Sequence, residues 1–419
     1  MPRPERSRVF ASLSERNVRI FFTGLGLSNI GTWAQTTAVV LLVTRLGGEG
    51  LEIGLAVAAQ FLPVLLLGLQ AGSIADRRDR HRMTLLTQVG MAIQAFALGL
   101  LDLAGLATIP LVCAMTAVYG TLSAFDIPAR RAFATELVPP ERLANVLSLS
   151  TSVMTGARIF GPSIAAFVAA EVGTAWVFLG NGVSFLAMIG GLLRIDRSRL
   201  HRVPAPTRSP HPIREGLRAV GSDPAMRVLL VVFSLVATFS FNHLVYLPLV
   251  VRDQLGASEQ TFGWVLSCMG IGNVLGALLV ARLVVVPLAW FYVPTIALGA
   301  SMSAIAFATR NEMVFLLAIP MGMAMTALIS SAGVILQQRF DASMRARLMA
   351  LTSVILMGST PIGGPVTGWI ADDAGVVPAT LYGGVIAIIA GGLGLLCARA
   401  AQNRSATPNE APPASRGTT

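Results

Sequence analysis

The chain has 419 residues, of which 54% are hydrophobic and only 12% are charged. Soluble proteins carry about a quarter charged residues, so this composition predicts a membrane protein. All 31 basic residues are Arg, and the absence of Lys excludes a Walker A phosphate loop as well as Schiff-base and pyridoxal chemistry, which need a lysine amine.

The chain offers little for binding a metal or a cofactor. Its three cysteines lie far apart in apolar stretches, which predicts neither a disulfide framework nor a zinc site. Three of the four histidines (His81, His201 and His211) are assigned to polar loops. We therefore expect no metal and no cofactor, and we assign the Arg-rich charge to membrane-flanking loops rather than to nucleic-acid binding.

Apolar runs long enough to cross a bilayer as a helix, which takes about 20 residues, recur along the whole chain. A polar stretch rich in Pro and Arg, residues 195–225, divides these runs into two sets of six. In chain order the twelve runs are 19–44, 51–75, 83–103, 108–127, 145–170, 174–194, 227–250, 261–281, 284–308, 313–337, 346–370 and 376–398.

The distribution of Arg predicts how these runs are oriented. With a cytoplasmic N-terminus, 27 Arg fall on inner segments, three (Arg45, Arg252 and Arg310) fall on outer loops, and Arg158 falls within a run. Positive charge accumulates on the cytoplasmic side of membrane proteins. We therefore expect a multi-pass protein of the cell membrane with both termini in the cytoplasm. The first run lacks a small-residue cleavage site after it and is predicted to be a retained helix.

These observations predict an all-α membrane protein with twelve transmembrane helices in two six-helix bundles. The bundles are assigned to residues 1–194 and 226–400, with a cytoplasmic linker at 195–225 and a disordered tail at 401–419. Within the linker, residues 213–222 are predicted to form a short amphipathic helix on the inner leaflet. Two related halves around a central pathway are typical of transporters.

A pattern of small residues recurs at matching positions in the two halves. The fifth run contains Gly156, Gly161 and Pro162, and the eleventh run repeats the order Gly, Gly, Pro within residues 358–365. Small residues let helices approach closely, and Pro frees a backbone carbonyl. The recurrence favours a shared structural role over ordinary packing.

The connection after the second run carries a recognisable motif. It contains Gly72, Asp76, Arg77 and Arg80 within a basic cluster, and it resembles the signature loop of the major facilitator superfamily. Asp79 stands where that family usually has Gly, which leaves the geometry of the turn open. The resemblance implies that Asp76 is a latch for the inner gate, held by a neighbouring helix N-terminus or an Arg, while the basic residues contact anionic lipid.

Other segments resemble one bacterial efflux branch of that superfamily, the enterobactin-exporter-like and macrolide-efflux-like proteins. They are residues 17–22, 28–33, 125–130 and 157–162. Together with Gly156, the last segment resembles the antiporter motif of the fifth span. The resemblance implies transport by alternating access and covers the first six runs better than the last six.

Few residues within the apolar runs could couple transport to protons. Arg158 is expected to bind an anionic or carbonyl-bearing group or to hold a carboxylate, unless it forms a structural pair with Asp126 or a backbone carbonyl. Because Arg keeps its proton, protonation is assigned to Asp126 or to His243, the one histidine within a run. Asp126 could instead be tied to Arg130, and His243 could be a packing residue. Proton coupling is therefore inferred from the resemblance more than from the residues.

Polar and aromatic positions within the runs predict a central cavity, although each could instead be a contact between helices. Helical spacing places Asn29 and Trp33 on one face of the first run, and Asn242, His243 and Tyr246 on one face of the seventh. Such a lining suits a bulky, partly apolar ligand. The predicted lining residues are Asn29, Trp33, Gln60, Tyr119, Asn181, Asn242, Tyr246 and Asn273.

The sequence thus predicts a secondary active transporter rather than an enzyme. We expect it to export a small organic molecule, either a drug-like compound or a secondary metabolite such as a siderophore, by proton antiport. Its expected partners are the substrate, protons and membrane lipid, and we expect a monomer. The alternatives are a proton-coupled uptake symporter and a non-transporting receptor or scaffold. A membrane-embedded enzyme is disfavoured because no Gly-x-Ser-x-Gly motif or cluster of intramembrane histidines occurs.

Overall fold

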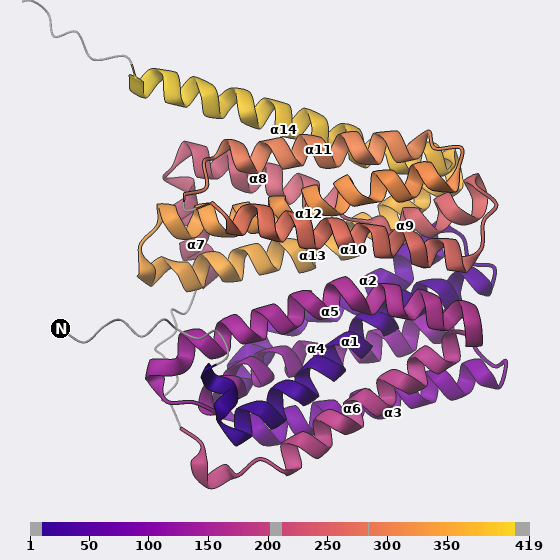
Figure 1. Ribbon diagram of the computed structural model, residues 1–419, viewed down its shortest axis with the longest axis vertical. Coiled ribbons are helices and arrows are strands. Elements are labelled where there is room, and N and C mark those ends of the chain that lie inside the picture. The colour runs from indigo at the N-terminus through magenta and orange to yellow at the C-terminus, as the bar shows by residue number, and fades with distance from the viewer. Residues whose placement is uncertain (1–10, 202–211, 284, 407–419) are drawn as a thin grey trace, which may run out of the picture.

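The computed structural model describes residues 11–201, 212–283 and 285–406, and every element in these ranges is helical. The part of the linker at 202–211 and the end of the predicted tail, 407–419, lie outside the described residues. Residues 401–406 of that tail continue the last helix. The long helices lie nearly parallel in two groups, side by side (Figure 1).

The first half of the chain forms one bundle of six long helices. The first of them, α1, packs against α5 and α6, while α4 packs against α2 and α3. Short 3-10 turns precede α1 and α5 and follow α6. The helices are α1 (Arg16–Arg45), α2 (Gly50–Arg77), α3 (Arg80–Leu103), α4 (Ile109–Glu136), α5 (Leu143–Val172) and α6 (Thr174–Leu193).

The second half forms a similar bundle. In it α12 packs against α10 and α11, and α14 packs against α11 and α8. The helices are α7 (Pro212–Gly221), α8 (Pro224–Phe239), α9 (His243–Leu249) with the π-helical η4 (Val250–Gln254), α10 (Glu259–Ala281), α11 (Ala289–Ala306), α12 (Asn311–Arg339), α13 (Ala342–Ala374) and α14 (Val376–Ala406).

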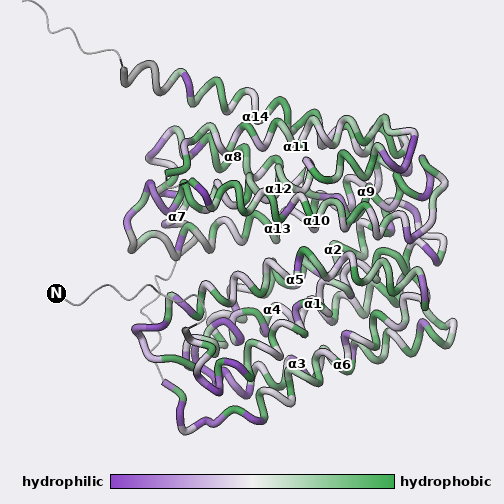
Figure 2. The backbone as a smooth tube through the Cα atoms, in the orientation of Figure 1, coloured by the Kyte–Doolittle hydropathy of each residue, from purple (hydrophilic) through white to green (hydrophobic). Residues whose placement is uncertain are grey.

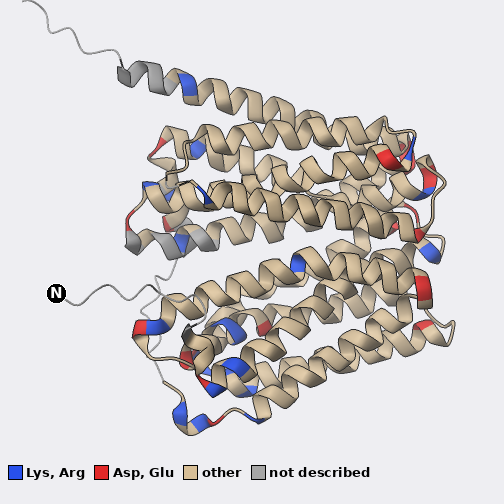
Figure 3. Cartoon of the chain, in the orientation of Figure 1, with Lys and Arg blue, Asp and Glu red and all other residues tan. Residues whose placement is uncertain are grey.

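The chain is a multi-pass membrane protein. Among the described residues, ten helical stretches are long and apolar enough to cross a membrane. Neither α1 nor α13 is among these ten, so the count of twelve spans stays a prediction. Hydrophobic residues run along the helices (Figure 2), and charged residues gather at their two ends, with most of the basic ones at the end where α1 begins (Figure 3).

The structure changes two details of the predicted elements. The seventh apolar run is broken at residues 240–242, between α8 and α9. The side-chain amide of Asn242 donates to the carbonyl of Thr238 (2.7 Å), which satisfies a carbonyl at the end of α8. His81, predicted in a loop, is buried in α3, where its Nε2 lies 2.9 Å from the carbonyl oxygen of Leu192. The predicted short linker helix is present as α7.

The two bundles meet along α2 and α13 and along α5 and α10. A Cβ on Gly50 would lie 2.6 Å from the carbonyl oxygen of Gly368, and one on Gly54 would lie 2.4 Å from that of Gly364. Distances this short exclude any side chain, so glycine allows these two backbones to touch. The contact joins the first half of α2 to the second half of α13 and closes the end of the molecule that is predicted to face outward.

Candidate functional site

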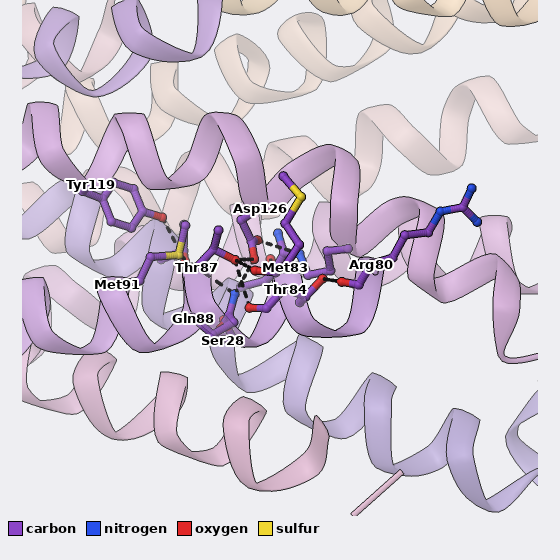
Figure 4. A network of polar contacts seen from close by, with 12 residues as sticks. Ser28, Arg80, Met83, Thr84, Thr87, Gln88, Met91, Tyr119 and Asp126 are labelled. Atoms are coloured by element: carbon purple, nitrogen blue, oxygen red, sulfur yellow. Dashed lines mark hydrogen bonds and ion pairs between the residues drawn. The ribbon is translucent and has the colours of Figure 1, made fainter. Parts of the chain in front are cut away.

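A buried network of polar side chains lies inside the first bundle, centred on Asp126 of α4 (Figure 4). Oδ1 of Asp126 accepts hydrogen bonds from Thr87 (2.8 Å) and Gln88 (3.0 Å), both on α3. Oδ2 of the same carboxylate lies 3.1 Å from Nε of Arg130, one turn further along α4. Asp126 is therefore a carboxylate held by three groups within one bundle.

This network extends to α1. Arg130 donates from Nη1 to the side-chain carbonyl of Asn29 (3.2 Å), and Ser28 donates to Gln88 (3.4 Å). Asn29, predicted to line a cavity, thus takes part in the ion pair between Asp126 and Arg130. The pairing of Asp126 with Arg130 is the structural alternative that helical spacing had left open, and no ion pair between Asp126 and Arg158 is found among the described residues.

Three other predicted lining residues of the first bundle bond to neighbouring helices. Gln60 of α2 donates to Thr36 (2.9 Å), Tyr119 of α4 donates to Thr32 (3.3 Å), and Asn181 of α6 donates to Gln35 (2.7 Å). All three acceptors lie on α1. These bonds fix α1 between three helices, and a role in a substrate cavity stays a prediction for each residue.

The predicted lining residues of the second bundle also have partners. The hydroxyl of Tyr246 lies 3.4 Å from the sulfur of Met321 on α12, and Asn273 on α10 accepts from Thr326 (2.8 Å). His243 differs from them. Its Nδ1 is buried and has no hydrogen-bond partner among the described residues.

Arg158 lies at the middle of α5. Its guanidinium carbon is 5.4 Å from the centre of the Trp33 ring on α1, within the range of a cation–π contact. A Cβ on Gly161, one turn further along, would lie 2.6 Å from Cβ of Trp33. Gly161 therefore allows α5 to approach α1 closely, and Pro162 beside it is buried. A Cβ added to Gly156 would meet no neighbour within 4 Å, so the first glycine of the motif serves no close approach.

The motif between the second and third spans is mostly helical. Gly72, Asp76 and Arg77 belong to the last turns of α2, and α3 begins at Arg80. Arg80 forms an ion pair with Glu136 at the end of α4, with Nη1 2.8 Å from Oε1. Asp76 is half-buried on the last turn of α2, and its role as a gate latch stays a prediction.

Asp79 explains why this turn does not need the glycine that is usual in the family. Its φ of −62° and ψ of 110° are open to any residue, and its side chain caps α3 by accepting from the amide of Arg82 (3.0 Å). It also pairs with Arg197 from the segment after α6. Burial raises the pKa of Asp79, but the hydrogen bond from Arg82 and the charge of Arg197 outweigh it and hold this pKa below its ordinary value.

An acidic residue that the sequence did not single out joins the two bundles at the end that is predicted to face outward. Asp372, near the end of α13, accepts hydrogen bonds from the backbone amides of Gly50 (2.6 Å) and Leu51 (2.8 Å). A carboxylate at a helix N-terminus is favoured by its free N–H groups and its dipole. Arg252 adds a bond to the carbonyl of Gly48 (3.0 Å). In the sequence, the adjacent acids Asp372 and Asp373 just after the eleventh apolar run are the signal that could have pointed to this contact.

Residues 7–414 match the model of the transmembrane secretion effector family, and the chain belongs to this family of major facilitator superfamily transporters. It is 28% identical to the multidrug efflux pump Tap of Mycolicibacterium fortuitum, over 85% of this chain and 89% of that protein. It is 20% identical to the staphyloferrin A transporter of Staphylococcus aureus, over 63% of this chain and 66% of that protein.

Solved structures show the same fold at low sequence identity. A bacterial homologue of the human lysosomal transporter Spinster, in an inward-facing and unoccupied conformation, covers 97% of this chain with a TM-score of 0.72 and 15% identity; 100% of that chain is matched. The nucleoside transporter NupG covers 94% of this chain and 100% of its own, with a TM-score of 0.69 and 13% identity. These structures show the fold, and the family match over residues 7–414 confirms the predicted family of transporters.

Proposed function

We propose that the protein exports a small organic molecule from the cytoplasm in exchange for protons. The observation that carries this proposal is the similarity to the efflux pump Tap over 85% of the chain. The similarity to a siderophore transporter supports a secondary metabolite as the alternative cargo to a drug-like compound. We place the protein in the cell membrane as a monomer of twelve spans, with both termini and the linker 195–225 in the cytoplasm.

Alternating access requires that the contacts between the bundles separate and re-form. At the end where α2 and α13 touch, the contacts that would have to separate are the close backbone approach at the glycines and the hydrogen bonds from Gly50 and Leu51 to Asp372. At the opposite end of the molecule, which is predicted to face the cytoplasm, we assign a gate that closes when the outer end opens. Its residues are Gly72, Asp76, Arg77 and Arg80.

The proposed site of proton binding is Asp126, because its exposure of 1% is the lowest of any acid in the described part of the chain. Its carboxylate has three donors, so loss of its charge would weaken its bond to Arg130 and loosen α4 from α3. Gaining and losing a proton would thereby change how two helices of the first bundle pack.

The test uses inside-out membrane vesicles with an imposed pH gradient and a panel of cationic, neutral and carboxylate-bearing fluorescent compounds. We expect at least one compound to dissipate the gradient as it is taken up, and vesicles without the protein to show no such effect. Asp126→Asn should abolish this exchange while the protein still purifies as a folded species. Uptake of compounds that leaves the gradient intact across the panel would contradict proton antiport.

The contribution of the ion pair between Asp126 and Arg130 to stability can be measured separately from proton exchange. Asp126→Ala leaves Arg130 buried without its carboxylate, which costs about 3 kcal/mol. Arg130→Ala in the same chain should return part of that loss, measured by thermal unfolding in detergent. A double variant as unstable as the sum of the two single ones would show that the pair does not stabilise α4.

A further inference from the structure

Arg158 has no counter-ion among the residues that the structure describes. Among the described residues no carboxylate oxygen lies within 4.0 Å of its guanidinium, and no hydrogen bond from it is found. A guanidinium at mid-membrane depth is costly unless it is paired or faces a water-filled space. Its one specific contact in the described part of the chain is the cation–π contact with the ring of Trp33, which leaves the N–H groups of the guanidinium without a hydrogen-bond acceptor.

The helices around Arg158 cannot supply that counter-ion. No Asp or Glu occurs in α1, α8 or α9, and the acids of α5 and α10, Glu171 and Glu259, lie at the ends of their helices. The buried acid of α4, Asp126, is held by Arg130, Thr87 and Gln88. None of the acids in these described helices is therefore available to pair with Arg158.

Arg158 also lies where the two bundles meet. The next residue, Ile159, contacts Gly270 of α10, whose added Cβ would lie 3.4 Å from the Ile159 carbonyl oxygen. From the second bundle α9, which begins at His243, reaches α1, the helix that carries Trp33. Both Arg158 and His243 are half-buried. The Arg158 guanidinium and Nδ1 of His243 thus come from opposite sides of the contact between the bundles, and neither has a hydrogen-bond partner among the described residues.

The geometry points to a binding site for an organic carboxylate between the bundles, with Arg158 as its anchor, Trp33 as its aromatic wall and His243 as a second polar contact. The guanidinium edge fits a carboxylate with two parallel hydrogen bonds, and the apolar surroundings favour an aromatic or aliphatic body on the ligand. This inference rests on the proposed transport function and narrows its substrates to molecules that carry a carboxylate.

The test measures binding to the purified full-length protein in nanodiscs, with dansylglycine and its methyl ester as probes. The two compounds share a fluorophore and differ in the carboxylate. We expect the wild-type protein to bind the acid at least about tenfold more tightly than the ester. Arg158→Gln should remove this preference, and Arg310→Gln, which removes an Arg from the connection before α12, should keep it. Equal affinities of the wild type for both probes, binding of neither, or an unchanged preference in Arg158→Gln would overturn the assignment.

A second variant covers the case in which Arg158→Gln does not fold. Arg158→Lys keeps the charge but loses the planar fork, so the acid should bind more weakly and still better than the ester. Loss of the whole preference in this variant, with an unchanged melting temperature, would overturn the paired geometry. The binding experiment uses no pH gradient. A failure of proton exchange in vesicles would therefore not affect the binding result, and equal binding of the acid and the ester would not decide whether the protein exchanges protons.

Discussion

Asp79 shows how one residue replaces the function of another in a family motif. A glycine at this position would leave the start of α3 without a side-chain cap. The aspartate instead accepts from the Arg82 amide and pairs with Arg197, which ties the connection between α2 and α3 to the segment after α6. The turn is thereby defined by a side chain rather than by backbone freedom.

The lowered pKa of Asp79 gives a prediction for stability against pH. A group whose pKa is lower in the folded state stabilises the protein above its unfolded pKa, and this contribution is lost as the pH falls through the folded value. Asp79→Asn keeps the cap and loses the charge, so its free energy of unfolding at pH about 7 should be slightly lower than that of the wild type. Because the pair of Asp79 and Arg197 is exposed, the difference should be less than about 1 kcal/mol. The gap should narrow on acidification and vanish once the pH falls below the lowered pKa of Asp79 in the folded protein.

Two further variants complete this experiment, which follows thermal unfolding in detergent. Asp79→Ala also removes the cap and should cost about 1 kcal/mol. Asp341→Asn is the matched control, because Asp341 precedes α13 without a capping side-chain bond. A gap between wild type and Asp79→Asn that grows as the pH falls would contradict the assigned direction of the pKa shift.

Single residues were the hardest part of the site to predict from the sequence. Helical spacing suggested the pair of Asp126 and Arg130, because residues four apart face each other on one helix. The partners Thr87 and Gln88 come from another helix, and no spacing within α4 reveals them. Their signal was two adjacent polar residues in an apolar run, which marks a buried network without saying which residue it serves.

Among the elements, α5 shows what the glycines of the antiporter-like motif do. Gly161 faces α1, and Gly156 faces open space. Gly161→Ala should destabilise the protein by about 1–3 kcal/mol, because its methyl group would collide with Trp33 and with the carbonyl of Ile30. Gly156→Ala is the control and should be neutral or stabilising by up to about 1 kcal/mol, as alanine favours a helix. Melting temperatures in detergent measure both.

A second outcome of the same pair separates packing from function. If Gly161→Ala were as stable as wild type, the close approach of α5 to α1 would not be needed for folding. If Gly156→Ala lost as much stability as Gly161→Ala, the close contact of Gly161 with α1 would not explain the loss.

The bounds of the long helices followed from hydropathy, because apolar runs of membrane length end where charged residues begin. The break between α8 and α9 did not, since residues 240–242 (Ser-Phe-Asn) contain neither Gly nor Pro. Its cause lies in tertiary packing. A Cβ on Gly363 of α13 would lie 1.7 Å from the carbonyl oxygen of Thr238, so α13 presses against the end of α8. Ser240 then bonds to the carbonyl of Gly383 on α14 (2.8 Å).

At the level of the whole molecule, Asp372 is predicted to bias the protein toward closure of the outer end. Asp372→Asn replaces a charged acceptor by a neutral one and should weaken the closed form by about 1 kcal/mol, about a fivefold change in population. The measurement uses a protein whose native cysteines are replaced and that carries spin labels at positions 106 and 310, in the predicted outer loops of the two bundles. Asp372→Asn should show a larger share of long distances between the two labels.

Asp373→Asn provides the matched control for this measurement. Asp373 has the same charge and lies one residue further along α13, and no hydrogen bond from an amide of α2 to it is found in the described part of the chain. The same shift in both variants would assign the effect to surface charge. An unchanged distance distribution in Asp372→Asn would show that other contacts, such as the glycines of α2 and α13, hold this end closed.

The position of α7 limits how far the inner ends of the bundles can separate. Glu215 of α7 pairs with Arg347 of α13 (2.8 Å), so the linker is fastened to the second bundle well before α8 begins. The 3-10 turn that follows α6 ends at Arg199, and α7 starts at Pro212. A fully extended chain gains about 3.4 Å per residue, so this stretch reaches no more than about 45 Å. The length of this stretch, rather than its sequence, therefore sets an upper bound on the distance between Arg199 and Pro212 in every state of the transporter.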